Sequence, residues 1–353
     1  MRPITRRLRL LIFLTATLST FTTAAAQNPC SPSAPQTAAA LAAQTVELKE
    51  DAEVALEVEA RSPGASWARK GSEAAALVVT VDGAYSQDVL LWAGEGFYVY
   101  RVMLGRLPKG THKVAVALDE ARSAAGARRA EVKSLRPVVS PARGAEDEFA
   151  LARAPFLYAR ANTIDHFTDI PLLMYYEVLH EGAETVYRYT VVFTNEDGGT
   201  QTAALFARWG RGTDIEWVNE VRVRAGKVVA ETFQGVQHET KNFQGQRTGG
   251  EHPLLAVASD NNNFSDLACS AVRFAPLPVG ARLEAATRES MMDNFPATYR
   301  AMTEELRREG RISESPSDIN TVADPREYLY VEAASVQEGA AVAFDVRLKG
   351  RVP

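Results

Sequence analysis

The chain has 353 residues, of which 39 are Lys or Arg and 44 are Asp or Glu, and its formal net charge is −5. This acidic balance argues against a nucleic acid as the partner, because phosphate binding relies on clustered Lys and Arg. The length exceeds what one hydrophobic core usually holds, so two domains are expected.

Residues 1–26 have the pattern of a secretory signal peptide. Four arginines precede an apolar run from Leu10 to Phe21, and alanines follow at positions 24 to 26. Cleavage is expected near Ala26, which makes the protein secreted, to the periplasm or the extracellular space. It would leave 35 basic and 44 acidic residues, a net charge of −9. No later segment has the long apolar run that crosses a bilayer, so the mature chain is expected to lack an integral membrane segment.

The chain contains two cysteines, Cys30 and Cys269. In an oxidising compartment one disulfide between them is expected, although two free thiols or an intermolecular bridge remain open. Zinc binding by cysteine is excluded, since neither residue has a second cysteine near it. Residues 27–44 are rich in Ser, Pro, Ala and Gln, which predicts a flexible tether.

Residues 45–140 have the pattern of an antiparallel β-sandwich. Val54, Leu56 and Val58 alternate with charged neighbours, which is the period of a half-buried strand. Further strand-like runs follow at short intervals, and the pair Asp82-Gly83 between two of them is a hairpin signal. We therefore predict an accessory sandwich of jelly-roll or immunoglobulin-like type. The polar residues 141–154 are predicted to link it to a second domain.

Residues 155–353 are predicted to form a second, larger antiparallel β domain with one amphipathic helix. The helix should begin at Pro296, bury Tyr299, Met302 and Leu306 on one face, and end at Gly310. The predicted fold class is thus mainly β, with two sandwich-like domains. The expected strands of the second domain are 172–179, 185–194, 202–209, 215–224, 227–234, 253–259, 327–336 and 341–350.

The stretch "TNEDGGT", residues 194–200, has the composition of a hairpin turn. Asn and Asp tolerate left-handed backbone, and Gly adopts it without penalty. Turn chemistry explains each of its residues except Glu196. Glu196 and the adjacent Asp197 are therefore also candidates for acid and base roles.

Asp214 and Glu216 are the most informative carboxylates. They are two residues apart on a predicted strand, so they should project from one face while Ile215 and Trp217 project from the other. One interpretation is a cleft in which the two carboxylates act as metal ligands or as a general acid and base.

The basic and aromatic neighbours of these carboxylates allow a second interpretation. Arg208 and Arg211 could pair with them on a solvated surface, which requires no function. In the functional interpretation, Trp209 would instead serve as a stacking platform. Spacing in the sequence leaves both open.

A third polar group lies at residues 260–266. Asp260, Asn262 and Asp266 are candidate calcium ligands, because calcium takes several oxygen ligands, but a turn rich in Asn and Asp explains them equally. His238 and His252 flank a loop rich in Gly and Gln and could converge from adjacent strands. No compact zinc motif such as HExxH accompanies them.

Residues 210–265 resemble the vacuolar protein sorting-associated protein 62 family. In that family an Asp-Trp-Glu-His strand motif precedes a histidine and then a Pro-initiated strand that leads to a Ser-His loop. This chain departs from the pattern, with Ile215 in place of Trp, Trp217 in place of His, and Asn262 near the position of the second His. The resemblance implies a β-rich fold. The corresponding residues are Asp214, Glu216, His238 and Pro253.

Three hypotheses about function follow. The first is a secreted protein that binds a glycan or cell-envelope polymer through the second domain, where Tyr175 and Tyr176 would add aromatic surface. The second is a polysaccharide-acting hydrolase, and the third is a structural envelope protein without a ligand pocket. The candidate ligand-binding residues are Arg208, Trp209, Arg211, Trp217, His238 and Asn262. The candidate catalytic residues are Glu196, Asp197, Asp214 and Glu216.

Overall fold

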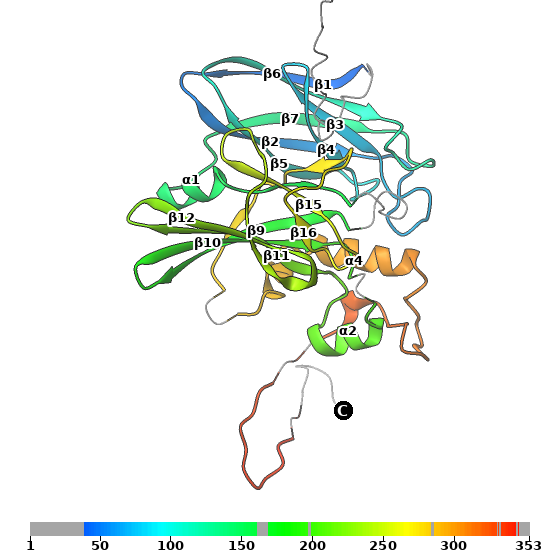
Figure 1. The fold of residues 1–353 in the computed structure, drawn as a ribbon. Coiled ribbons are helices and arrows are strands. Elements are labelled where there is room, and N and C mark those ends of the chain that lie inside the picture. The colour runs from blue at the N-terminus through cyan, green and yellow to red at the C-terminus, as the bar shows by residue number, and fades with distance from the viewer. Residues whose placement is uncertain are drawn as a thin grey trace, which may run out of the picture.

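The computed structural model describes residues 39–160, 169–196, 199–283, 286–329, 331, 333–343 and 345. Figure 1 shows that these residues form mostly strands, which confirms the predicted mainly β fold. The predicted signal peptide and Cys30 lie outside the described residues, so the leader and the disulfide to Cys269 stay predictions. Within the described part, no helix is both long and apolar enough to cross a membrane.

The first seven strands form an N-terminal β-sandwich. One sheet has the order β1-β6-β3-β4 and the other β5-β2-β7. Val54, Leu56 and Val58 are fully buried between the sheets, as the predicted alternation requires. The strands are β1 (Ala40–Leu48), β2 (Ala52–Arg61), β3 (Ala76–Val81), β4 (Ala84–Leu90), β5 (Tyr98–Leu107), β6 (Gly110–Asp119) and β7 (Glu131–Val139).

The remaining strands belong to two further sheets. The larger sheet has the order β13-β12-β11-β10-β9-β18, and the smaller has the order β14-β15-β8-β17 with β16 paired to β15. The larger sheet comprises β9 (Pro171–Glu181), β10 (Glu184–Phe193), β11 (Ile215–Arg224), β12 (Lys227–Gln234), β13 (Thr240–Asn242) and β18 (Val279–Ala281). The smaller comprises β8 (Phe156–Tyr158), β14 (Arg247–Thr248), β15 (His252–Val257) and β17 (Arg273–Phe274), with β16 (Phe264–Ser265) at its side.

The two faces of the six-stranded sheet pack against different partners. On one face, Val191 and Val218 pack with Leu255 and Phe264 of the smaller sheet. On the other face, Ile215 packs with residues of the helices α3 (Ser290–Asn294) and α4 (Ala297–Arg308). Neighbouring residues of one strand therefore enter different environments, as the alternation of a strand requires.

The predicted amphipathic helix is confirmed as α4. Met302 and Leu306 are buried, Tyr299 packs beside them, and Gly310 has φ 71°. Pro296 is the residue before the helix rather than its first residue. The prediction of a single helix is wrong, because α3 also packs on this face.

The segment predicted as a strand at residues 202–209 is instead the helix α2 (Thr202–Trp209). Ala, Leu and Arg are good helix formers, and eight residues are too few for periodicity to separate a helix from a strand. Gly210 ends the helix with φ 67°, a left-handed conformation that glycine adopts without steric cost.

The strand predicted at residues 327–336 does not form in the described part of that segment, although its sequence is apolar and alternating. These residues find no strand partner there, and alternation alone does not form a strand. Most of residues 341–350 lies outside the described residues, so the strand predicted there stays a prediction. The predicted linker 141–154 contains the short helix α1 (Ala145–Leu151).

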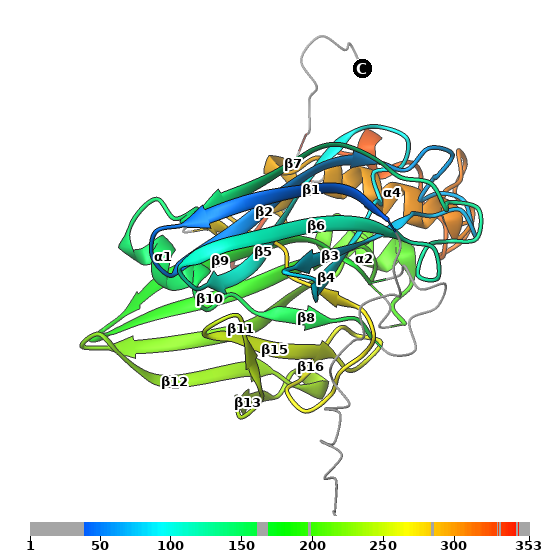
Figure 2. The same ribbon diagram turned by 90° about the horizontal axis from the view of Figure 1, so that it is seen from above.

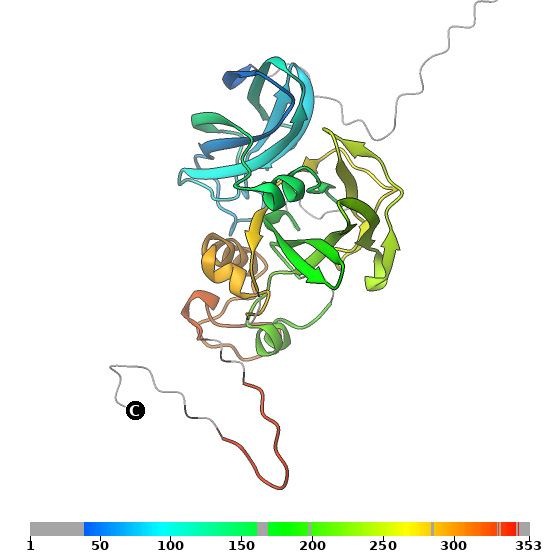
Figure 3. The ribbon, with the colours of Figure 1, turned by 90° about the vertical axis from the view of Figure 1, so that its left-hand side faces the viewer.

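The N-terminal sandwich is joined to the second part by buried polar contacts. Trp67 Nε1 donates to Glu305 Oε2 of α4 at 2.8 Å, and Ala275 N donates to Gln87 Oε1 at 3.0 Å. Figures 2 and 3 show the sandwich lying against one side of the second part. These contacts join residues of the N-terminal sandwich to residues about 190 to 240 positions later in the chain.

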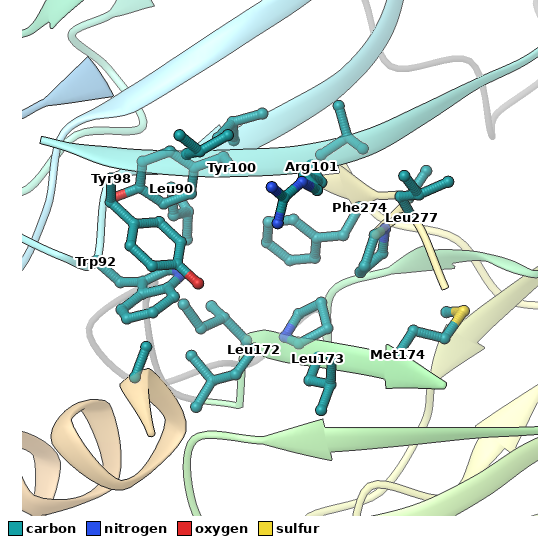
Figure 4. A pocket seen from close by; sticks show the side chains of 18 of the residues that line it. Leu90, Trp92, Tyr98, Tyr100, Arg101, Leu172, Leu173, Met174, Phe274 and Leu277 are labelled. Atoms are coloured by element: carbon teal, nitrogen blue, oxygen red, sulfur yellow. The ribbon is translucent and has the colours of Figure 1, made fainter. Parts of the chain in front are cut away.

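A small cavity of about 120 Å³ lies where the two parts meet (Figure 4). Trp92 and Tyr98 line it from the N-terminal sandwich, with ring centroids 4.8 Å apart. Leu172 and Met174 of β9 line it from the other side. Its walls are mainly apolar, which fits interface packing better than recognition of a polar ligand.

Candidate functional site

Asp214 and Glu216 lie where β11 begins, in the middle of the second part. Phe193 N donates to Asp214 O at 2.8 Å, and Glu216 is paired in register with Val191 of β10. Because Val191 faces the smaller sheet, Glu216 projects to that face and Asp214 lies beside it. Asp214 is 1% exposed and the Glu216 side chain 12% exposed. The two carboxylates are therefore nearly withdrawn from water.

Amide side chains from two other segments meet these carboxylates. Asn262 Nδ2 donates to Asp214 Oδ2 at 2.9 Å, and Gln234 Nε2, at the end of β12, donates to Glu216 Oε2. Such hydrogen bonds stabilise the charged form of a carboxyl group. They partly offset the cost of removing the carboxylates from water.

Burial and mutual repulsion nevertheless dominate the ionisation of this group. Burial raises the pKa of Asp214 well above its usual range, and the charges of Glu216 and Glu196 raise it further, against the Asn262 hydrogen bond. Burial also raises the pKa of Glu216, although Gln234 and the charge of His238 oppose this. Glu196, which is 8% exposed, thus belongs to the same group. Asp197 lies outside the described residues.

His238 connects these residues to the loop that follows β15. Its Nδ1 lies 3.0 Å from Gln234 Nε2 and 3.8 Å from Glu216 Oε2. Its Nε2 lies 2.9 Å from Asn261 Nδ2, and its Nδ1 lies 3.4 Å from Asn263 Nδ2. The His238 side chain is 54% exposed, so it forms the solvent-facing edge of the group. We call this group the carboxylate–amide cluster. It comprises Glu196, Asp214, Glu216, Gln234, His238, Asn261, Asn262 and Asn263.

The backbone of the cluster adopts unfavourable conformations. Gln237, His238 and Asn262 have φ of 63°, 60° and 46°, in the left-handed region that non-glycine residues rarely occupy. Each such residue costs on the order of 1 kcal/mol or more, and they concentrate at functional sites. Asn262 is fully buried, and its Oδ1 has no hydrogen-bond partner among the described residues. The surrounding structure thus holds two loops in place against a local cost.

The candidate ligand-binding residues divide between the two faces of the sheet. His238 and Asn262 join the cluster, whereas Trp217 is paired with Thr190 and projects to the opposite face. Trp209 lies with Trp217, where both line a hollow of about 640 Å³. Trp209 is therefore separated from the carboxylates by the sheet, and it cannot serve as their stacking platform.

The arginines next to these carboxylates in sequence have other partners. The guanidinium carbons of Arg208 and Arg211 lie 4.6 and 5.2 Å from the centroid of the Trp209 ring. Arg211 is buried, and its Nε donates to Glu289 Oε1 at 3.1 Å. The charge of Arg211 still acts on Asp214, but no direct ion pair between them forms. Asp214 is therefore buried and bonded to Asn262, and it is not a solvated carboxylate paired with Arg208 or Arg211.

The candidate calcium ligands do not converge. Asp260 Oδ1 accepts from Arg160 Nη1 at 2.9 Å, and Asp266 Oδ2 accepts from Gln244 N at 2.7 Å. Asn262 instead contacts Asp214. Across the described ranges, no group of three or more His, Cys, Asp or Glu side chains is arranged to hold a metal ion.

Three further residues behave differently from their sequence-based interpretation. His252 is fully buried between Ala154 O at 2.8 Å and Glu53 Oε2 at 3.1 Å, so it connects the two parts and lies outside the cluster. Tyr175 and Tyr176 are buried, which removes them from any glycan surface.

Sequence reasoning did not identify Gln234. The available signal was a polar residue at the end of a predicted strand, directly before Gly235 and four residues before His238. Its role can be recognised only when the pairing of β12 with β11 is known, because that pairing brings Gln234 to Glu216.

No protein-family model matches the chain, and no curated protein matches it. The resemblance to the vacuolar protein sorting-associated protein 62 family therefore stays a prediction. Solved structures that share some similarity include a family 35 carbohydrate binding module from an environmental isolate, at 14% identity and a TM-score of 0.20, covering 29% of this chain and 70% of that one.

Two others are NLPPya in complex with glucosamine and a ruminal GH26 endo-beta-1,4-mannanase. The first has 12% identity and a TM-score of 0.29, and covers 46% of this chain and 80% of that one. The second has 12% identity and a TM-score of 0.21, and covers 40% of this chain and 27% of that one. Similarity at this level establishes neither a fold nor a function for this chain.

Proposed function

We propose that this protein binds a glycan, and that the carboxylate–amide cluster is the binding site. The observation that carries the proposal is the convergence of carboxylate, amide and imidazole groups from separate segments on a strained backbone. These side chains supply both hydrogen-bond donors and acceptors, which is what a sugar with several hydroxyl groups requires. Hydrogen bonds from hydroxyls to carboxylates are also stronger than those between neutral groups.

The charge of the cluster restricts the ligand. The charge of Glu196 already opposes the ionisation of Asp214 and Glu216, so a further negative charge on a ligand at this place would be unfavourable. A neutral saccharide avoids this cost. His238 and Asn261, at the solvent-facing edge, are the groups that a ligand would meet first.

We also propose that the protein is secreted, so that it meets polymers of the cell envelope or its surroundings. The support is the leader pattern of residues 1–26. Expression of the full chain followed by fractionation and N-terminal sequencing tests this. A mature N-terminus near residue 27 in the exported fraction is the expected result, and an intact leader in the cytoplasm would contradict it.

A panel of neutral polysaccharides, with equilibrium binding measured for each, tests glycan binding. Glu216→Gln and Asn261→Ala should each raise the Kd about tenfold, because the loss of one hydrogen-bond partner in a partly buried site costs about 1 to 3 kcal/mol. Glu239→Gln is the matched control, since Glu239 directly follows His238, is exposed, and pairs with Lys241 at 3.5 Å. If no polysaccharide binds, or both variants bind like wild type, the proposal fails and a structural role is favoured.

A hydrolase is the second candidate, and one observation favours it. Burial raises the pKa of both Asp214 and Glu216, which is how a carboxyl group is kept protonated to act as a general acid. Release of reducing ends from the bound polysaccharide separates the two functions. Release that Glu216→Gln abolishes would establish the hydrolase, whereas binding without release would leave the binding protein.

A further inference from the structure

The hollow on the opposite face of the six-stranded sheet has the features of a second ligand site. Its volume of about 640 Å³ falls within the range of small-molecule sites. β9, β10, β11, α2 and the segment before α3 contribute to its walls. We call it the tryptophan hollow, after Trp209 and Trp217.

Two part-exposed indole rings form its apolar surface. Trp209 ends α2, and the left-handed Gly210 directs the chain back so that Arg211 also reaches its ring. Arg208 and Arg211 lie within cation–π distance of this ring, which fixes its orientation. Trp217 on β11 contributes the second ring. Rigid indoles offer flat apolar surface at low entropic cost, and the apolar face of a sugar ring can pack on such a surface.

The polar lining carries more positive than negative charge. Arg188, Arg208 and Arg288 line the hollow together with Glu177 and Glu289. Two partners lie just outside: Glu220 accepts from Arg188 at 2.7 Å, and Arg211 pairs with Glu289 at 3.1 Å. Among the residues that line the hollow, three are arginines and two are glutamates. A positive balance at this place contrasts with the net charge of −5 of the whole chain, and such local fields select ligands of the opposite charge.

Arg288 is the arginine best placed to meet a ligand. It is exposed, and its Nη1 donates to Ile215 O at 2.8 Å, which anchors the guanidinium at the start of β11. A guanidinium has five N–H donors in a planar fork that matches the two oxygens of a carboxylate. Because one N–H group of Arg288 is already bonded to Ile215 O, the side chain loses little further entropy when its remaining N–H groups bind a ligand.

We infer that the tryptophan hollow is a second binding site, for a saccharide that carries a negative charge, with the sugar ring on the indoles and the anion on the guanidinium groups. The carboxylate–amide cluster lies on the other face of the sheet, because Glu216 and Trp217 are neighbours on one strand. The two sites therefore differ in ligand charge, and this inference does not depend on the proposed function.

Equilibrium binding to oligogalacturonate and to its fully methyl-esterified form tests the inference. The two ligands share the sugar ring and differ in charge, so the acid should bind about tenfold or more tightly and lose affinity as salt rises. A sulfated oligosaccharide forms a further arm that distinguishes carboxylate from sulfate as the anion. Absence of binding to both anionic ligands, or equal binding of the methyl ester, would overturn the inference.

Two variants place the binding in the hollow. Arg288→Gln should reduce the affinity for the anionic ligand about tenfold and leave binding of the neutral ester unchanged. Trp209→Phe keeps an aromatic ring in the same position and should weaken both ligands. Arg128→Gln is the matched control, because Arg128 is an exposed arginine of the N-terminal sandwich. Circular dichroism melts identify a variant that has unfolded. A folded Arg288→Gln protein with wild-type affinity would refute the site.

Discussion

Glu305 provides a direct test of how the two parts of the molecule are joined. It lies fully buried on α4 and accepts hydrogen bonds from Trp67 Nε1 at 2.8 Å and Arg308 Nη2 at 2.6 Å. Burial raises the pKa of Glu305 from 4.5 to about 7, against the opposing effects of Arg308 and Trp67. Replacing it with Gln keeps the shape and an acceptor for Trp67 but removes the titration.

The sign of the effect follows from proton binding. Between pH 4.5 and about 7 the unfolded chain releases the Glu305 proton while the folded chain keeps it. The stability contributed by this group is therefore complete below pH 4.5 and is lost as pH rises through 7. Each pKa unit corresponds to about 1.4 kcal/mol, so the free energy of unfolding should fall by about 3 kcal/mol across this interval because of Glu305 alone.

Urea denaturation of wild type and Glu305→Gln at pH 4.5, 5.5, 6.5 and 7.5 measures this quantity. Other carboxyl groups also titrate, so the informative value is the difference between the two proteins at each pH. Relative to wild type, the variant should gain about 3 kcal/mol from the lowest to the highest pH. Glu120→Gln, at an exposed position, is the control and should follow wild type. A constant difference between variant and wild type would refute the assigned environment of Glu305.

Three further predictions concern the cluster and the junction. Asp214→Asn should raise the free energy of unfolding near neutral pH, because burial raises the pKa of Asp214 and its ionisation opposes folding; urea denaturation measures this, and a less stable variant would contradict it. Asn262→Ala should destabilise by about 1 to 3 kcal/mol, since it leaves Asp214 without its donor; a neutral result in the same assay would argue against that hydrogen bond. Gly105→Ala should lower the Tm more than Gly71→Ala: both have positive φ, but only at Gly105 would the new Cβ meet backbone, at 3.0 Å from Gly249 O. Equal losses of Tm in the two variants would mean that the positive φ alone causes the destabilisation and that the contact with Gly249 O does not contribute.

Local patterns predicted the strands that carry the cluster. The alternation of Ile215, Glu216 and Trp217 correctly assigned their faces, because a two-residue period needs only the strand itself. The same period predicted β2, and the pair Asp82-Gly83 predicted the hairpin turn, in which Asp82 has φ 53°. These features arise within a few residues of chain, and their physics is local.

The sequence-based predictions of secondary structure were wrong where the local sequence is compatible with more than one conformation. Residues 202–209 have helix-forming composition but a length that suits a strand as well, and packing beside the sheet decided for the helix. Residues 327–336 alternate like a strand but have no partner in their described part. A strand is stable only when its backbone groups are paired, and pairing depends on chain far away in sequence.

The sequence by itself determined the β class, the faces of β11, the amphipathic helix and the acidic character of the chain. Only the tertiary structure decided which polar residues meet. Gln234 and Asn262 contact the carboxylates, whereas Trp209 and Trp217 line a hollow on the opposite face of the sheet. The physical reason is that side-chain direction along a strand is a local property. The identity of the group that covers a face is set by sheet order and by loops that are distant in the sequence.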